Sequence, residues 1–274
     1  MPHAVRRAPL YLLVAGILAL VGIPFLWILQ ASFQPNRLLI QPTPRFSPGE
    51  LGFANYQNLQ QAAQYVTYLR NSVVVATLST FVSLVLALFA AYSVYRVRYP
   101  GRRALFRLLI VTYVFPGVLL LIPLYQIFGR LGLIDDLLSL VIVNVTFAAP
   151  FCVWLLRGFF GAIPEGIEEA AAIDGAGRLR VLFAIILPLT APGLAATAIY
   201  TFILSWTEYM FASAFIVDET RKTLPVGLGA FIAQYYVDWG ILAAAAIATA
   251  VPVVVFFAFI GRYFVRGLTA GAGK

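Results

Sequence analysis

The stretch PEGIEEAAAIDGAG, residues 164–177, interrupts an otherwise apolar chain. Pro164 suits the first turn of a helix, because proline lacks the N–H that would be unpaired there. The glutamates that follow would lie at the positive end of the helix dipole, and the three consecutive alanines favour helix and carry little bulk. Gly175 can adopt the left-handed backbone that ends a helix. The sequence therefore predicts a short helix, a glycine turn and a second helix over 178–188. This insert could dock into a groove on a partner, or it could be a solvated connection.

The residues around this insert have the composition of a membrane protein. The chain has 274 residues, of which 62% are hydrophobic and only 11% are charged. A soluble domain has about 25% charged residues. The net charge of +8 does not indicate a nucleic-acid partner, because the basic residues flank apolar runs and form no single patch. With one cysteine, Cys152, and one histidine, His3, we expect no disulfide, no metal site and no catalytic residues.

Six apolar runs are long enough to cross a bilayer as helices, which takes about 20 residues each. Long unbroken runs favour helices over barrel strands. We therefore expect an all-α integral membrane protein with a single transmembrane domain over residues 1–274. The expected spans are 10–33, 72–95, 104–128, 137–156, 184–206 and 240–260.

The basic residues predict the direction of these spans, because lysine and arginine concentrate on the cytoplasmic side. Thirteen of the 19 would lie on one side of the six-span arrangement and six on the other. Both termini are therefore expected to be cytoplasmic. So is the loop 157–183, which contains the opening stretch.

The sequence from residue 169 onward resembles the EAA motif of ABC-importer permeases, which has the form E-A-A-x3-G-x9-I-x-L-P. Every motif position and both spacings fit. The matching residues are Glu169, Ala170, Ala171, Gly175, Ile185, Leu187 and Pro188. In that family the motif is a cytoplasmic coupling helix that docks on an ATPase subunit, and the charge count places it on that side independently.

Other stretches are similar to the carbohydrate-import branch of that family, the MalG type. They are FPGVLLLIPLYQIFGRLGLIDD (115–136), SWTEYMF (205–211), TLPVGLGAFI (223–232) and RYFVRGLTAGAGK (262–274). The second departs from the family pattern at Thr207, where asparagine is usual. Within this branch the chain also resembles the corresponding permease of a trehalose importer.

The resemblance implies a type I ABC importer permease fold in the plasma membrane of a prokaryote. This subunit would translocate a sugar, a disaccharide such as trehalose or maltose. It would be no enzyme and would bind no cofactor, because ATP and Mg would be held by the partner ATPase. Its partners would be a second, homologous permease, two ATPase subunits, an extracytoplasmic sugar-binding protein or lipoprotein, and membrane lipid.

The resemblance also implies several functional sites. ATPase docking is expected at Glu168, Glu169, Ala170, Ala171, Asp174 and Gly175. A C-terminal ATPase contact is expected at Gly267, Leu268, Thr269, Gly271 and Lys274. A loop touching the binding protein would carry Tyr235, Tyr236 and Trp239, which equally suit an interfacial aromatic belt. Polar residues at membrane depth are candidates for the translocation path: Asn144, Ser205, Thr207 and Glu208. Glu208 fits a structural contact as well as a path role.

Two other classes of transporter stay open. One is an ABC importer for another solute, such as glycerol phosphate or an oligosaccharide. The other is an ion-coupled secondary transporter, which would usually show ionisable groups at membrane depth or an internal repeat. A membrane enzyme is disfavoured, because no cluster of catalytic residues is present.

Overall fold

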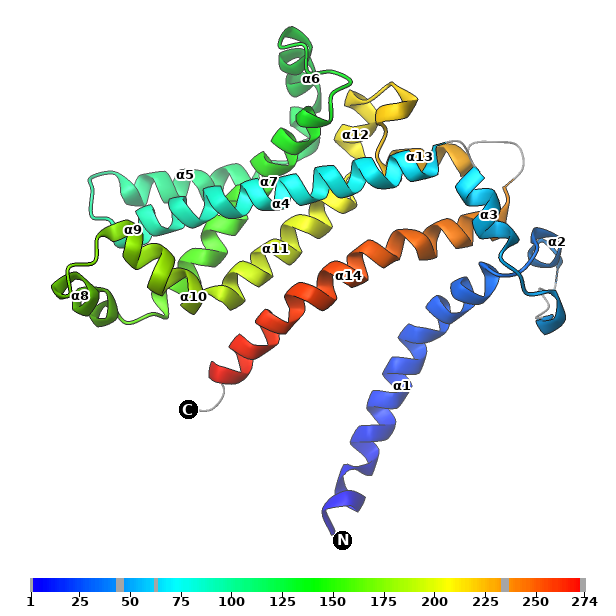
Figure 1. Ribbon diagram of the computed structural model, residues 1–274, viewed down its shortest axis with the longest axis horizontal. Helices are drawn as coiled ribbons and strands as arrows, with labels where there is room; N and C mark the ends of the chain where they lie inside the picture. The colour runs from blue at the N-terminus through cyan, green and yellow to red at the C-terminus, as the bar shows by residue number, and fades with distance from the viewer. Residues whose placement is uncertain (1, 43–46, 62–63, 233–236, 272–274) are drawn as a thin grey trace. The chain divides into compact units, whose positions relative to one another are not determined.

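The computed structural model describes residues 2–42, 47–61, 64–232 and 237–271, which form helices and turns with no strand among them (Figure 1). Side chains are described for 10–229 and 237–263 within these ranges. Four helices are long and apolar enough to span a membrane, or up to six if each of two bent pairs is one span. The expected all-α membrane fold is confirmed.

The helices follow one another in the order shown in Figure 1. Their bounds are α1 (Pro2–Ala31), α2 (Asn36–Leu39), η1 (Pro48–Glu50), α3 (Ala54–Gln61), α4 (Tyr65–Arg96), α5 (Arg102–Val114), η2 (Gly117–Leu120), α6 (Leu121–Arg130), α7 (Leu137–Gly161), α8 (Glu165–Ile173), α9 (Arg178–Val181), η3 (Leu182–Ile186), α10 (Leu187–Leu189), α11 (Ala191–Trp206), α12 (Met210–Phe215), η4 (Glu219–Arg221), α13 (Leu224–Ile232) and α14 (Trp239–Gly271).

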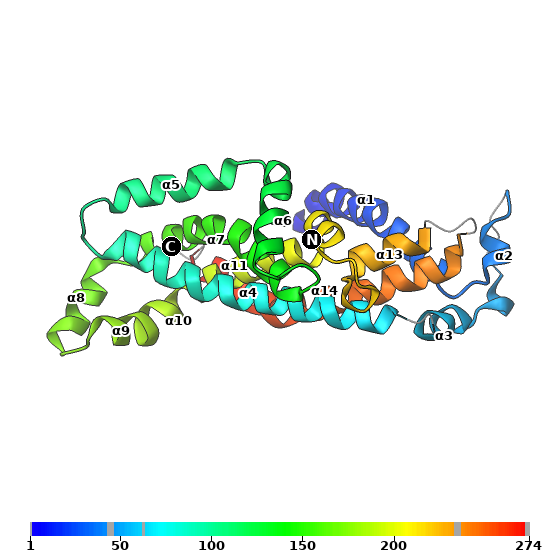
Figure 2. The ribbon, with the colours of Figure 1, turned by 90° about the horizontal axis from the view of Figure 1, so that it is seen from above.

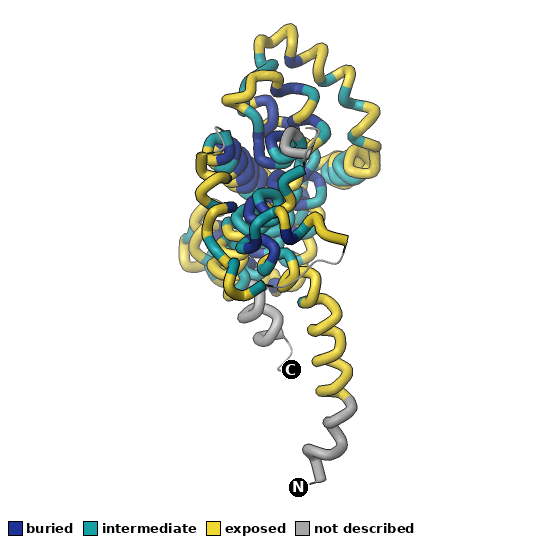
Figure 3. Tube along the Cα trace, turned by 90° about the vertical axis from the view of Figure 1, so that its right-hand side faces the viewer, coloured by how far each residue is buried: buried dark blue, intermediate teal, exposed yellow. Residues whose placement is uncertain are grey.

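The chain divides into two compact units. The first consists of Met1–Val66 and Leu228–Val251. Within it, the buried Asn55 donates hydrogen bonds to the carbonyls of Ser32 (3.0 Å) and Gln34 (2.8 Å), which ties α3 to the turn after α1. Gly240 packs on the same amide, and a Cβ at that position would lie 2.6 Å from Asn55 Nδ2. The described side chains of α1 are mostly exposed (Figure 3). In a membrane this apolar surface faces lipid or another subunit.

The second unit consists of Thr67–Gly227 and Pro252–Lys274. Its centre is α7, which packs on α11 and α5, as Figure 2 shows for α5. Cys152, Leu156 and Phe160 of α7 are fully buried. They pack with residues of α4 and η3 in one apolar cluster. The Cys152 thiol also contacts the Thr201 hydroxyl at 3.3 Å, so it is an internal packed group.

The expected run over 104–128 is divided in the structure. α5 ends at Val114, Phe115 is extended, and a bend of 91° separates α5 from the segment Gly117–Arg130, which comprises η2 and α6. Pro116 explains the break, because the residue before a proline is disfavoured in helical conformation.

The run that precedes Trp206 is divided too, with a bend of 77° between Arg178–Leu189 and Ala191–Trp206. Pro188 and Pro192 flank the break at Thr190, and proline cannot donate the helical hydrogen bond. Leu182–Ile186 forms a π-helix, an uncommon local widening that is frequent at functional sites.

We predict that Gly193→Ala destabilises the contact between α11 and α7. A Cβ at Gly193 would lie 2.6 Å from the Phe159 ring, so the ring or the helix must shift. Overpacking of this kind costs about 1–3 kcal/mol. Thermal unfolding in detergent should therefore show a lower midpoint than the unchanged chain. Gly158→Ala on α7 is the matched control, because nothing lies within 4 Å of its added Cβ. Equal midpoints for both variants would contradict the prediction.

Candidate functional site

The insert at 164–177 folds as a helix, a turn and a second helical run. Pro164 precedes α8 as its N-cap, with extended backbone (ψ 134°), so it stands one position before the first turn expected for it. Glu165 and Glu168 lie in the first turn of α8, at the positive end of its dipole. α9, η3 and α10 continue directly from one another over residues 178–189.

Gly175 closes α8 with a Schellman motif. Its φ is +80°, in the left-handed region that the sequence predicted. The N–H of Gly175 donates to the carbonyl of Ala172 (3.1 Å), and the N–H of Ala176 donates to that of Ala171 (2.9 Å). These are the two hydrogen bonds of that motif. The geometry therefore sets the angle between α8 and α9 by backbone alone.

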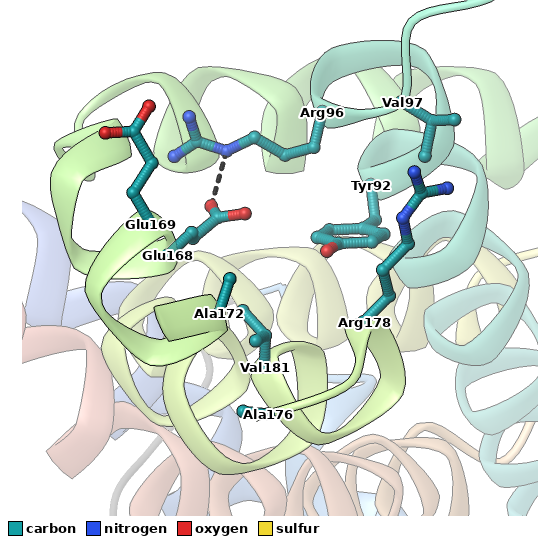
Figure 4. A pocket seen from close by; sticks show the side chains of 9 residues that line it. All are labelled: Tyr92, Arg96, Val97, Glu168, Glu169, Ala172, Ala176, Arg178 and Val181. Atoms are coloured by element: carbon teal, nitrogen blue, oxygen red, sulfur yellow. Dashed lines mark ion pairs between the residues drawn. The ribbon is translucent and has the colours of Figure 1, made fainter. Parts of the chain in front are cut away.

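Arg96, the last residue of α4, fastens α8 to two spans. Its side chain is 6% exposed and forms ion pairs with Glu168 (2.7 Å) and Glu165 (3.5 Å). It also donates hydrogen bonds to the carbonyls of Phe160 (3.0 Å) and Ile163 (2.7 Å), at the end of α7 and just beyond it. One guanidinium thus joins α4, the end of α7 and the start of α8. Figure 4 shows its ion pair with Glu168.

The Arg96 guanidinium opposes the effect of burial on the Glu168 carboxyl. Burial raises the pKa of Glu168, the Arg96 guanidinium lowers that pKa, and the neighbouring Glu165 raises it further. Sequence reasoning missed Arg96, which was counted only as a topology charge. The basic residue at the end of an apolar run, with acids in the next cytoplasmic segment, was the signal available.

A cavity of about 230 Å³ lies between α4, α8 and α9. Figure 4 shows its lining, which is Tyr92, Arg96, Val97, Glu168, Glu169, Ala172, Ala176, Arg178 and Val181. Glu169, the motif glutamate, is exposed, and it forms no ion pair among the side chains that the structure describes. Its carboxylate is available to a partner cation.

The six residues expected to dock divide into two groups. Glu169, Ala170, Asp174 and Gly175 are exposed, whereas Ala171 packs against the apolar cluster of the second unit and Glu168 pairs with Arg96. Ala171, expected to contact an ATPase, thus contacts its own chain, because that face of α8 is turned inward. Ile173 was missed by the sequence reasoning. It is 87% exposed at the end of α8 and offers an apolar contact beside the glycine turn.

Two of the four candidates for the translocation path are buried, and the other two bond to nearby backbone groups. Asn144 of α7 and Ser205 of α11 are buried side chains. Thr207 donates to the carbonyl of Ile203 (2.9 Å), and Glu208 accepts from the N–H groups of Phe211 (2.7 Å) and Ala212 (2.9 Å). Both oxygens of Glu208 thus cap α12, which is the structural contact considered from the sequence. Their path roles stay predictions.

The remaining candidates lie partly outside the described residues. Tyr235, Tyr236 and Lys274 are outside them, and Gly267, Leu268, Thr269 and Gly271 are placed only as backbone in the last turns of α14. Trp239 is half exposed and, with Trp27, lines an apolar cavity of about 190 Å³ in the first unit. Among the described residues no group of three His, Cys, Asp or Glu side chains could hold a metal ion.

Comparison with known proteins identifies the family. Residues 83–269 match the family described as "Binding-protein-dependent transport system inner membrane component". The chain is 36% identical to the inner membrane ABC transporter permease protein YcjP of Escherichia coli (strain K12), over 99% of this chain and 98% of that protein. It is 34% identical to the trehalose transport system permease protein SugB of Mycobacterium tuberculosis (strain CDC 1551 / Oshkosh), over 92% of each.

A solved structure gives the same result for the fold. A chain in the crystal structure of a bacterial ABC transporter involved in the import of the acidic polysaccharide alginate superposes with a TM-score of 0.79. The two chains are 23% identical, and the match covers 93% of this chain and 94% of that one. The fold and resemblance expected from the motif are confirmed. The chain therefore belongs to the binding-protein-dependent transport system inner membrane components, as a multi-pass permease subunit of a prokaryotic plasma-membrane ABC transporter and not as an enzyme.

Proposed function

We propose that this chain is the subunit through which an ABC importer moves a carbohydrate into the cytoplasm, with ATP-driven movement entering at α8. The observation that carries the proposal is the exposed end of α8. There Glu169, Ala170 and Ile173 face outward beside a glycine turn, while Arg96 holds the other side of the helix to the spans. A short helix that presents one open face and is fixed on the other suits docking into a groove.

The proposed partners follow the family. Two ATPase subunits bind ATP and Mg, and one of them receives α8 together with residues 267–274. A second, homologous permease completes the membrane path as a heterodimer. An extracytoplasmic binding protein delivers the sugar and contacts the loop that carries Tyr235, Tyr236 and Trp239. The loop 157–183 and both termini are cytoplasmic in this arrangement, in agreement with the lysine and arginine count.

The mechanism follows from the contacts of Arg96. When the ATPases close, a displacement of α8 pulls on Glu168, and the pair transmits it to the end of α4. The hydrogen bonds from Arg96 to the Phe160 and Ile163 carbonyls carry the same displacement to α7. The displacement of α8 also reaches α11 through α9 and η3, across the break at Thr190. Rigid-body rocking of spans around a central site is the general form of such transport.

The proposed cargo is a disaccharide such as trehalose or maltose. The relatives support a carbohydrate, since one is named for trehalose and a chain of similar fold belongs to an alginate importer. These two named sugars differ in size and charge.

The test is reconstitution of the complete complex in liposomes, with ATP hydrolysis and uptake measured for a panel of sugar-loaded binding proteins. We expect stimulation by a disaccharide-loaded binding protein. Stimulation only by a binding protein loaded with glycerol phosphate or an amino acid would overturn the carbohydrate assignment. Uptake that persists when ATP hydrolysis is blocked but stops when the proton gradient collapses would favour an ion-coupled transporter instead.

A further inference from the structure

A second cavity, which shares no lining residue with the first, is strongly basic. It measures about 490 Å³ and is lined by Val94, Tyr95, Arg102, Arg103, Phe106, Arg107, Arg157 and Glu165. Four guanidinium groups thus surround it with one carboxylate. That carboxylate, Glu165, already lies 3.5 Å from Arg96, so it neutralises little of the charge.

Two of the four arginines, Arg102 and Arg157, are held in place by contacts other than an acidic partner. Arg157 lies over the ring of Phe106 (4.5 Å) and near that of Tyr95 (5.9 Å), and Arg102 donates to the carbonyl of Val97 (3.2 Å). Among the side chains that the structure describes, none of the four forms an ion pair. Such a set of guanidinium groups is suited to a phosphate, which accepts hydrogen bonds from several of them at once.

The N-terminus of α5 adds to this positive field. The helix begins at Arg102 after a left-handed Gly101, and no side chain caps it. Its first N–H groups therefore lack helical partners, and the helix dipole places partial positive charge beside the arginines.

An apolar groove adjoins the charged cavity and shares one residue with it. This groove, of about 390 Å³, is lined by Trp154, Leu155, Arg157, Gly158, Phe159 and Ala162 of α7 and the turn after it. Arg157 thus stands between a basic cavity and an apolar one. On α5, Leu105, Leu108 and Val111 are also exposed, at three-residue spacing. A ligand that fits both cavities has an anionic head and an apolar tail.

We propose that the arginine cavity binds the phosphate headgroup of an anionic phospholipid, with an acyl chain in the groove along α7. All four arginines belong to the set expected at the cytoplasmic membrane surface, where anionic headgroups lie. A free phosphate would use the cavity but leave the groove empty. The apolar groove therefore favours the lipid over a soluble anion.

The first experiment measures direct binding. The complete complex is exchanged into nanodiscs of phosphatidylcholine, and spin-labelled phosphatidylglycerol is titrated against spin-labelled phosphatidylcholine. We expect a preference for phosphatidylglycerol that falls about fivefold for each arginine replaced by glutamine, and about a hundredfold in Arg103→Gln/Arg107→Gln/Arg157→Gln. The matched control Arg98→Gln/Arg180→Gln/Arg262→Gln removes the same charge from the same predicted membrane side but outside the cavity. If both triple variants lost the preference for phosphatidylglycerol equally, general surface charge would explain the preference. That result would overturn the proposed site.

A second variant separates the lipid from other occupants. Gly158→Trp fills the groove, where nothing lies within 4 Å of the added Cβ, and leaves the arginines intact. It should weaken binding of phosphatidylglycerol while binding of inorganic phosphate stays unchanged. Equal phosphatidylglycerol binding in this variant and the unchanged complex would point to a soluble phosphate instead. Phosphatidylglycerol that binds the isolated chain but is released when the ATPase or second permease is added would identify an interface between subunits. Either outcome would refute the lipid site.

Discussion

Gly175→Val is expected to abolish transport while the complex remains assembled in the membrane. Gly175 has a φ of +80°, where a side chain is strained even though the space around it is open. Forcing a Cβ into left-handed backbone costs about 1–2 kcal/mol, and a β-branched residue costs more. A cost of about 2 kcal/mol lowers the population of the native turn roughly thirtyfold. The angle between α8 and α9 is then lost, and ATPase movement reaches α8 without reaching the spans.

The measurement is the ratio of sugar transported to ATP hydrolysed in proteoliposomes. Gly175→Asn should retain much of this ratio, since asparagine tolerates the left-handed conformation. Gly166→Ala on α8 is the matched control, because this glycine has no positive φ and its added Cβ meets nothing within 4 Å. Normal coupling in Gly175→Val would remove the turn from the mechanism.

Ala170→Trp, on the exposed face of α8, should also uncouple transport, because it blocks the surface proposed to dock.

Arg96→Gln is expected to produce the second large effect. It leaves the Glu168 carboxylate, which is 16% exposed, without its cation, and it removes hydrogen bonds to two carbonyls at the end of α7. Breaking one partner of a buried ion pair costs about 3–5 kcal/mol, and the partial exposure of Glu168 places this pair at the lower end. We expect a lower unfolding midpoint and a reduced transport-to-hydrolysis ratio.

A double-mutant cycle separates the pair from the rest of the network. Arg96→Gln/Glu168→Gln should recover part of the loss, since replacing both partners costs less than stranding one. The cycle should give a coupling free energy of about 1–3 kcal/mol. Arg98→Gln, two residues further on and exposed, provides the control. If the effects of Arg96→Gln and Glu168→Gln were additive, the coupling free energy would be zero. The ion pair would then have no part in transmitting the movement of α8. A fall in midpoint with an unchanged transport-to-hydrolysis ratio would limit Arg96 to a structural role.

The elements that depend on neighbouring residues in the sequence could be predicted. Long apolar runs yielded the helices α4, α7 and α14, because each forms its hydrogen bonds within itself. The helix and glycine turn at 165–175 followed from the residue types present there. Pro116 and Pro188 lie at the two breaks, where proline favours a kink, but the size of each bend depends on packing and was not predictable.

The elements that depend on residues far apart in the chain could not be predicted. Arg96 and Glu168 are separated by 72 positions, and only the fold brings α4 and α8 together. Ala171 and Ala170 are chemically identical, yet one packs inward and the other is exposed, which depends on the face of α8 that the apolar cluster covers. Glu208 could be assigned as a helix cap only once α12 was seen to start behind it.

The burial of Cys152 has a practical consequence for measurements on this transporter. It is the one cysteine of the chain, it is fully buried in the apolar cluster, and its thiol contacts Thr201. Water-soluble maleimides therefore have little access to it, and the natural sequence already serves as a background for site-directed labelling. A cysteine introduced at Ile173, 87% exposed beside the glycine turn, would be the reactive thiol of the chain. Fluorophores or cross-linkers at that point could follow the approach of the ATPase during the cycle.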